Sequence, residues 1–220
     1  MQQHRRWRVQ PRQGFIGRSP LERLVDGNAR GHQPAAAQHA DEIAGLVAAF
    51  ADAARLAVDA GFDALELHCG HNYLLSSFLS PLLNRRRDGY GGPLVNRARF
   101  AREVAAAVRA AVGDQVAVWA KLNMYDGTPR RGPLRGFDVD EACATARLFE
   151  ADGHLDAIEP TAGSSLLNPM YLFHGDVPRK EFADAFSGPM RWGLKVAGPV
   201  FLKHYPYHDA YLLPLAKQLR

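Results

Sequence analysis

Cysteine is scarce in this chain of 220 residues, and two of them, Cys69 and Cys143, cannot build a disulfide framework. The sequence also lacks any run of about twenty apolar residues, so it predicts no membrane span. No apolar stretch follows the arginines near the N-terminus, which argues against a secretory signal. From these absences we expect a cytoplasmic protein.

Acidic residues are absent from positions 1–18, which hold five arginines and account for much of the formal net charge of +4. A basic excess of this kind has two interpretations, a solvated tail or a nucleic-acid-binding module. No ladder of aromatic residues and no nucleic-acid motif accompanies the arginines. We therefore favour the tail and expect no nucleic-acid partner.

From residue 41 onward, helical and strand patterns alternate. Because short connections join them, this order predicts an α/β fold with a parallel sheet. Between 164 and 206 we expect only short helices, since proline, glycine and aromatic residues break any period. The expected helices run from 41 to a stop at Gly61, over 95–112, from the cap Asp138 to Gly153 and over 208–220, and the expected strands cover 62–67, 116–122 and 155–159.

The expected strand 116–122 reads VAVWAKL and is almost continuously apolar. Such a run is typical of a parallel strand that is buried on both faces. Lys121 interrupts it close to its C-terminal end. A buried lysine is costly unless an anionic group answers it, so the position of Lys121 is informative. The alternative is a lysine whose ammonium group reaches the solvent at the rim.

His68, His71 and Tyr73 follow directly after the expected strand 62–67. An α/β barrel places its reacting groups just past the ends of its strands. Taken alone, two loop histidines with local hydrogen bonds and a packed aromatic ring would explain the same residues. A metal site at His68, Cys69 and His71 lacks further ligands at suitable spacing, so we predict no metal.

Four motifs follow one another over residues 68–100. They read His-x-x-His-x-Tyr-Leu, Phe-Leu-Ser-Pro, Asn-x-Arg-x-Asp-x-Tyr-Gly-Gly and Asn-Arg-x-Arg-Phe, and they occupy 68–74, 78–81, 84–92 and 96–100. In this order they resemble the old yellow enzyme family of flavin-dependent ene-reductases, including its dienoyl-CoA reductase branch. The resemblance continues more loosely from about residue 41 to the C-terminus.

The resemblance implies that 41–220 forms part of a (β/α)8 TIM barrel and that its three strands correspond to strands four to six. Residues 1–40, an irregular basic segment, show no counterpart in the family. A full barrel typically needs ~250 residues and eight strands. Three parallel strands leave two unpaired edges and an uncovered inner face. Two ways of covering them stay open, a homo-oligomer and a complementing chain.

The resemblance also implies chemistry. The family uses FMN, reduced by NAD(P)H, to pass a hydride to the activated C=C bond of a small enone or enoyl substrate. In the family, residues matching His68 and His71 hydrogen-bond the substrate carbonyl oxygen. The residue matching Tyr73 lies at the active site, and in several members it protonates the α-carbon. The residue matching Lys121 lies by the pyrimidine edge of the flavin. Because no G-x-G-x-x-G motif is present, we expect NAD(P)H to act as a diffusing reductant.

Two further interpretations stay open. The arginines at 85–87 and the loop 88–92 are typical of a fixed structural loop, and a contact with the phosphates of a CoA substrate is the alternative. The rival to the whole enzymatic hypothesis is a non-catalytic fragment of such an enzyme that binds no flavin.

Overall fold

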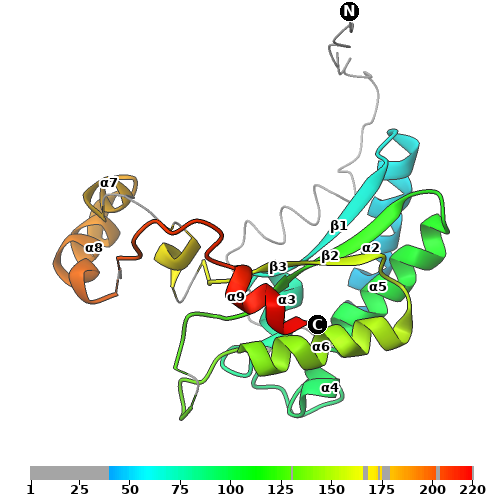
Figure 1. The fold of residues 1–220 in the computed structure, drawn as a ribbon, viewed down its shortest axis with the longest axis horizontal. Helices are drawn as coiled ribbons and strands as arrows, with labels where there is room; N and C mark the ends of the chain where they lie inside the picture. The colour runs from blue at the N-terminus through cyan, green and yellow to red at the C-terminus, as the bar shows by residue number, and fades with distance from the viewer. Residues whose placement is uncertain are drawn as a thin grey trace, which may run out of the picture.

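The computed structural model describes residues 40–219 except 130, 166–167, 173, 175–178 and 202–203. Our prediction of an irregular segment over 1–40 lies outside the described residues, except that residue 40 opens a helix. Within the described part, three strands form one parallel sheet in the order β1, β2, β3 (Figure 1). This sheet and its alternation with helices confirm the α/β prediction. The strands are β1 Ala64–Cys69, β2 Ala117–Asn123 and β3 Ala157–Thr161.

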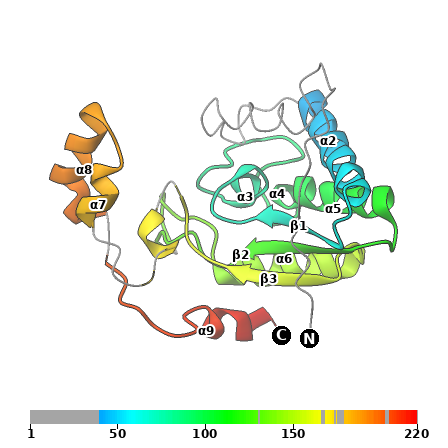
Figure 2. The same cartoon turned by 90° about the horizontal axis from the view of Figure 1, so that it is seen from above.

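The long helix before β1 and the two long helices that connect the strands lie on one face of this sheet (Figures 1 and 2). They are α2 Ala40–Asp59, α5 Arg99–Val112 and α6 Val139–Asp152. Their apolar sides pack against the inward side chains of the strands, and Phe100, Val104 and Phe149 are among the fully buried residues. The core therefore lies between one layer of helices and one face of the sheet.

The remaining helices follow at the carboxyl ends of the strands and toward the C-terminus. They are α3 Leu74–Leu79, α4 Leu94–Arg97, η2 Pro169–Leu172, α7 Arg179–Asp184, α8 Gly188–Phe201, α9 Leu213–Ala216 and η3 Lys217–Leu219. Over 164–206 we expected short helices, and η2 and α7 are short, but α8 with 14 residues is as long as α5 and α6. However, α7 and α8 pack on each other and lie apart from the sheet (Figure 2). None of the helices in the described part of the chain is long and apolar enough to cross a membrane.

The strands begin later than the sequence predicted, by two residues at β1 and β3 and by one at β2. At β1 the apolar Phe62 suggested an earlier start, but its side chain is 61% exposed and lies in the turn before the strand. As a result, His68 does not follow the strand, as we expected, but is its second-last residue. The expected helix 95–112 is also divided, because Ala98 separates α4 from α5.

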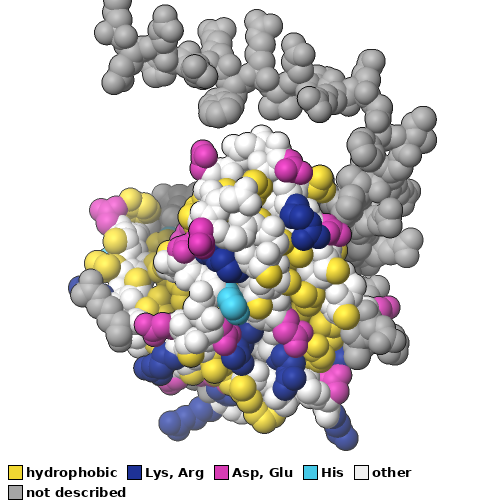
Figure 3. Space-filling view, turned by 90° about the vertical axis from the view of Figure 1, so that its right-hand side faces the viewer, with side chains coloured by type: hydrophobic (Ala, Val, Ile, Leu, Met, Phe, Trp, Pro, Cys, Tyr) yellow, Lys and Arg dark blue, Asp and Glu magenta, His cyan; other side chains and the backbone are white. Residues whose placement is uncertain are grey.

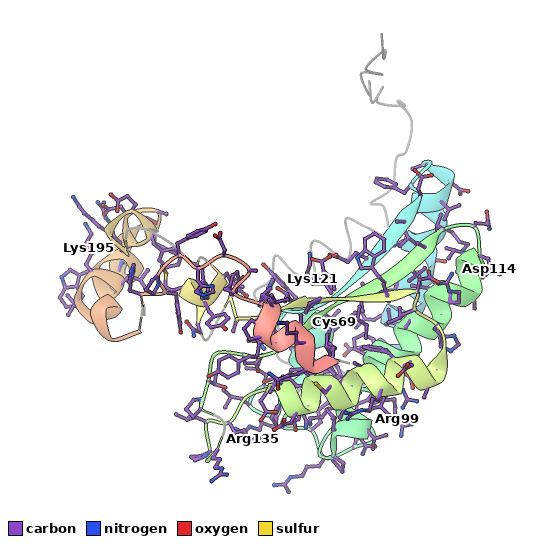
Figure 4. The ribbon with its side chains drawn as sticks, in the orientation of Figure 1. Cys69, Arg99, Asp114, Lys121, Arg135 and Lys195 are labelled. Carbon is purple, nitrogen blue, oxygen red and sulfur yellow. The ribbon has the colours of Figure 1, made fainter. Side chains whose placement is uncertain are left out.

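The two faces of the sheet differ sharply, and this corrects the prediction that β2 is buried on both. Val118, Ala120 and Leu122 point toward the helices and are 0% exposed. Trp119 and Lys121 alternate with them and are half-buried on the opposite face. Figure 4 shows Lys121 on the side of the sheet away from α5 and α6. The run looked doubly buried because Trp119 is apolar although it lies on the open face.

Charged side chains of both signs are interspersed on the face of the molecule shown in Figure 3. The basic side chains of this face are therefore mixed with acidic ones and form no continuous stripe. Among the described residues, ion pairs join neighbouring parts of the chain, such as Arg102 with Asp152 at 2.6 Å and Arg109 with Asp156 at 2.6 Å. The Arg102–Asp152 pair is partly exposed, so it contributes only about 0–1 kcal/mol to stability.

Asp138 caps the N-terminus of α6, as the sequence predicted. The carboxylate of Asp138 accepts a hydrogen bond from the backbone N–H of Glu141 at 3.2 Å. The reciprocal arm of a capping box is replaced, because the Glu141 carboxylate accepts from Arg97 at 2.6 Å. Asp138 therefore carries the capping interaction.

We expect Asp138→Ala to lower the free energy of unfolding by about 1 kcal/mol, because an N-terminal N–H of α6 loses its acceptor. Asp138→Asn preserves a capping oxygen and is the control, with a much smaller loss. Urea denaturation followed by circular dichroism measures both. Equal losses in the two variants would show that the charge of Asp138, through Arg135 at 3.6 Å, matters more than the cap.

Candidate active site

Three charged side chains cross the open face of the sheet, one from each strand. The ammonium group of Lys121 on β2 lies 3.1 Å from a carboxylate oxygen of Glu66 on β1 and 3.2 Å from one of Glu159 on β3. Glu66 also accepts a hydrogen bond from the indole N–H of Trp119 at 2.9 Å. Lys121 thus has the anionic partners that its position requires, and this row of Glu66, Lys121 and Glu159 fixes the orientation of the lysine side chain.

The charges of this row support one another. Burial alone would lower the pKa of Lys121, but the hydrogen bonds to Glu66 and Glu159 raise it overall. Burial likewise works to raise the pKa of Glu66, and hydrogen bonds from Trp119 and Lys121 lower it overall. Both groups are therefore charged at neutral pH. The face carries one fixed ammonium flanked by two carboxylates.

The three residues that the sequence singled out as catalytic lie together beside this row. His68 is the register partner of Lys121 across β1 and β2. Its ring centroid lies 5.1 Å from that of His71 and 5.2 Å from that of Tyr73. Tyr73 is 39% exposed, so its ring borders the solvent. All four predicted site residues therefore gather at the carboxyl end of the sheet, while their roles stay predictions.

His71 is held by contacts with the loop that follows β3. Its Nε2 lies 2.8 Å from the hydroxyl oxygen of Thr161, the last residue of β3. Its carbonyl oxygen accepts hydrogen bonds from the backbone N–H of Ser165 at 3.2 Å and from the Ser165 hydroxyl at 2.8 Å. These bonds join residues about ninety positions apart and tie β1 to the far edge of the sheet.

Both imidazoles are neutral at physiological pH. Burial, followed by the electrostatic repulsion that protonated His71 would meet from His68 and Lys121, lowers the pKa of His71 to about 4. Burial also lowers the pKa of His68, helped by Lys121 and opposed by Glu66. A neutral imidazole carries one N–H donor, and its other nitrogen accepts. The pair can therefore donate hydrogen bonds to an oxygen or sulfur atom of a bound molecule.

The depressed pKa of His71 predicts how stability depends on pH. The folded chain binds fewer protons at His71 than the unfolded chain between pH 4 and the ordinary value near 6.5, so stability rises with pH there. We expect acidification across this window to cost roughly 1–2 kcal/mol through His71, since its partly exposed ring is screened by solvent. Chemical denaturation at a series of pH values measures this slope.

The matched comparison for this slope is His71→Asn against His204→Asn. His204 is exposed and lies outside the site, so its replacement should leave the slope unchanged. His71→Asn should flatten it. If both variants keep the slope of the wild type, the cost of acidification arises elsewhere in the chain.

Gly70 allows the close approach of the groups around it. A Cβ atom there would lie 2.8 Å from the Thr161 methyl carbon and 3.4 Å from Cε1 of His68. A side chain at position 70 would therefore collide with Thr161 at the end of β3, and glycine avoids this collision. The sequence analysis missed Gly70 together with Glu66 and Glu159. The alternation of a strand could have indicated Glu66, because it lies two residues before His68 on the same face.

The arginine-rich turn has the contacts of a fixed loop. Arg86 pairs with Asp88 and lies over the rings of Phe78, at 5.8 Å, and Tyr90, at 6.0 Å. A Cβ atom at Gly91 would lie 2.2 Å from the carbonyl oxygen of Arg86, so only glycine fits there. These contacts support the structural interpretation of 85–92 over a phosphate contact.

Metal coordination finds no support among the residues that the structure describes. No three of their His, Cys, Asp or Glu side chains gather in a way that could hold a metal ion. Cys69, the third member of the metal alternative, is 0% exposed on the helix side of β1. Burial raises the pKa of its thiol to about 12, so it is neither a ready ligand nor a nucleophile.

Comparison of the sequence with known proteins identifies the family of this chain. Residues 19–149 match the model of the NADH:flavin oxidoreductase / NADH oxidase family. The chain belongs to this family. The match begins within the segment 1–40, where we identified no resemblance, and ends inside α6.

Named relatives of the family are similar to this chain over part of their length. A 4,4'-dithiodibutanoate disulfide reductase of Rhodococcus erythropolis is 51% identical over 179 residues, which are 81% of this chain and 43% of the relative. Enoate reductase 1 of Kluyveromyces lactis is 41% identical over 99 residues, which are 45% of this chain and 24% of the relative. The chain thus spans less than half the length of either relative.

The fold is also similar to that of a solved structure. A 2-naphthoyl-CoA reductase in complex with 2-naphthoyl-CoA superposes with a TM-score of 0.53 at 23% identity, and covers 83% of this chain and 30% of that one. At this identity the likeness concerns the fold alone. It supports the parallel α/β arrangement.

Proposed function

We propose that this chain is the central part of a (β/α)8 barrel that binds FMN on the open face of its sheet and reduces a small electrophilic substrate. The observation that carries the proposal is the gathering of Lys121, His68, His71 and Tyr73 at the carboxyl end of that sheet. Reacting groups occupy this end in characterised barrel enzymes. Helices cover the other face, as they would around the outside of a barrel.

The residues present fit a flavin. Lys121 offers an ammonium group whose side chain is 26% exposed, and its two carboxylate partners hold it in place on the open face. When bound, FMN would accept a hydride from NAD(P)H and pass it to the substrate. Lys121 would hold the electron-rich edge of the ring by a charge-assisted hydrogen bond. Glu66 and Glu159 would moderate that charge.

The first candidate acceptor is an activated C=C bond. Hydride arriving at the β-carbon moves an electron pair toward the conjugated carbonyl oxygen. Neutral N–H donors of His68 and His71 would stabilise the charge that develops there. The phenol of Tyr73, beside His68 and open to solvent, would give a proton to the α-carbon. The substrate gains one hydride and one proton, which completes the reduction.

The second candidate acceptor is a small organic disulfide. The disulfide reductase that is 51% identical over 81% of this chain favours it. Hydride arriving at one sulfur breaks the S–S bond, and the electron pair leaves with the other sulfur as a thiolate. The histidine pair would stabilise that thiolate, and water would supply its proton. This reaction needs the same histidines but has no demanding proton transfer to carbon.

The proposal is tested first by flavin binding. We expect the purified chain to retain FMN in stoichiometric amount after gel filtration, with the visible absorption of a bound flavin. Lys121→Ala should weaken binding about tenfold, because one charge-assisted hydrogen bond is lost. Lys195→Ala is the control, since Lys195 pairs with Asp184 on the separate α7 and α8 pair (Figure 4).

The size of the species that binds FMN tests how the open sheet is completed. We expect flavin to elute with a homo-oligomer or with an added complementing chain, because β1 and β3 are the edge strands of the described sheet. A folded, monodisperse chain that retains no FMN under any of these conditions would favour the non-catalytic alternative.

A further inference from the structure

Asp126 lies in the loop after β2 and is 1% exposed. Its two carboxylate oxygens accept four hydrogen bonds. The donors are the side-chain amides of Asn72 at 3.2 Å and Asn123 at 2.7 Å, the hydroxyl of Ser80 at 2.7 Å and the backbone N–H of Phe137 at 2.8 Å. None of these donors carries a charge. Asp126 is therefore a buried acceptor that gathers neutral donors from separate parts of the chain.

The donors come from four separate parts of the chain near the carboxyl ends of β1 and β2. Asn72 belongs to the turn after β1, and Ser80 closes α3. Phe137 lies directly before the cap of α6. Burial raises the pKa of Asp126, and these hydrogen bonds work against that rise. A buried carboxyl group is costly without partners, and the four donors compensate this cost at Asp126.

The turn that Asp126 holds is strained. His71 and Asn72 both adopt left-handed backbone angles, with φ of 59° and 61°. For residues other than glycine this costs on the order of 1–2 kcal/mol each, and such a turn persists only where its surroundings fix it. The Asn72 side chain, whose other amide atom is buried without a partner, is anchored by Asp126. Ser165 and Thr161 hold the turn from the other side.

We propose that Asp126 is a positioning residue that locks the left-handed turn at His71 and Asn72, and so aims the His71 imidazole toward His68 and places Tyr73 next to it. The role in catalysis rests on the proposed function. The positioning itself does not, because it can be measured in the flavin-free chain. Loss of the lock should let the turn relax and water reach the ring of His71.

The sharpest test compares Asn72→Gly with Ser80→Ala. Each variant removes one hydrogen bond to Asp126, but only Asn72 links Asp126 to the turn. Glycine accepts the φ of 61°, so Asn72→Gly removes the link without adding strain, while His71 keeps its own left-handed angle of 59° and remains strained. The readout is the titration of His71, followed by NMR of the ¹⁵N-labelled imidazole.

We expect Asn72→Gly to raise the pKa of His71 from about 4 toward its ordinary value, by about one pH unit or more, because the ring becomes hydrated. Ser80→Ala should lower the stability but leave this titration unchanged. Asp126→Asn should reproduce the titration of Asn72→Gly, and combining the two should add nothing further. If Asp126→Asn does not fold, the comparison of Asn72→Gly with Ser80→Ala still tests the proposal.

Two outcomes would overturn the proposal. One is a His71 titration in Asn72→Gly identical to that of the wild type. The other is an equal shift in Ser80→Ala, which would make Asp126 a general stabiliser of the core. Neither outcome depends on FMN, so a chain that fails to bind flavin can still confirm the lock. In a flavin-loaded chain, Asn72→Gly should lower kcat while FMN affinity stays the same.

Discussion

Replacing Arg97 by methionine should lower the free energy of unfolding by about 3–5 kcal/mol, the largest effect that we expect from a single substitution outside the site. Arg97 is 3% exposed. Its guanidinium donates to the carbonyl oxygens of Leu79 and, at 3.0 Å, Gly92, and it pairs with Glu141 at 2.6 Å. Methionine fills the space but leaves the buried carbonyl oxygen of Leu79 and the largely buried carboxylate of Glu141 without these donors.

The matched control is Arg102→Met. Arg102 also pairs bidentately with a carboxylate, Asp152, at 2.6 and 2.7 Å, but the two side chains are 29% and 21% exposed. Water can replace the lost partner there, so the loss should stay below about 1 kcal/mol. Urea denaturation with an unchanged slope measures both. If the two losses agree within about 1 kcal/mol, the burial of Arg97 carries no special weight.

Arg97→Lys distinguishes charge from geometry. Lysine retains the charge but lacks the planar fork that reaches two carbonyl oxygens and a carboxylate at once. We therefore expect it to recover little of the stability lost in Arg97→Met. Arg135 lies 2.8 Å from Glu141 and keeps that carboxylate partly compensated in every Arg97 variant. We therefore expect most of the loss to come from the carbonyl oxygen of Leu79, which is 0% exposed. Water can reach the exposed Gly92 and replace the donor there.

The sequence predicted the order of elements because each signal was local. The cap Asp138 and the stop Gly153, whose φ is 69°, mark α6 within its own residues. The strand ends were less certain, because an apolar residue such as Phe62 does not reveal whether it enters the sheet. Trp119 misled in the same way, since its hydrophobicity suggested burial on a face that the structure leaves open. Those errors concern tertiary environment rather than local preference.

In the site, too, the sequence revealed the residues with local signals and missed those that depend on tertiary contacts. The motifs on 68–100 identified His68, His71 and Tyr73 because they lie within six residues of one another. The carboxylates that hold Lys121 depend on strand register, which pairs it with His68 on one side and Glu159 on the other. Asp126 was missed for the same reason, because its partners Asn72 and Ser80 are 54 and 46 residues away. Only the folded chain brings these groups together.

The kinetic effect of Tyr73→Phe should depend on the substrate, and this distinguishes the two candidate reactions. Reduction of an enone leaves an α-carbon that needs a proton, and general acid catalysis typically contributes 10²–10⁴-fold. In the flavin-loaded chain we therefore expect Tyr73→Phe to lower the rate of enone reduction by about 10²-fold or more. Reduction of a small disulfide should fall by less than about threefold, since a thiolate leaves without a proton.

The comparison needs one further variant, because Tyr73→Phe could disturb the site as a whole. His68→Asn should impair both reactions to a similar degree, since the histidine pair would stabilise charge on the oxygen of one substrate and on the sulfur of the other. Stopped-flow oxidation of the reduced flavin by each substrate separates this step from NAD(P)H binding. A Tyr73→Phe variant that reduces the enone at the rate of the wild type would remove Tyr73 from the mechanism. Equal losses on both substrates would instead assign the Tyr73 ring, which is 39% exposed and 5.2 Å from His68, to substrate binding.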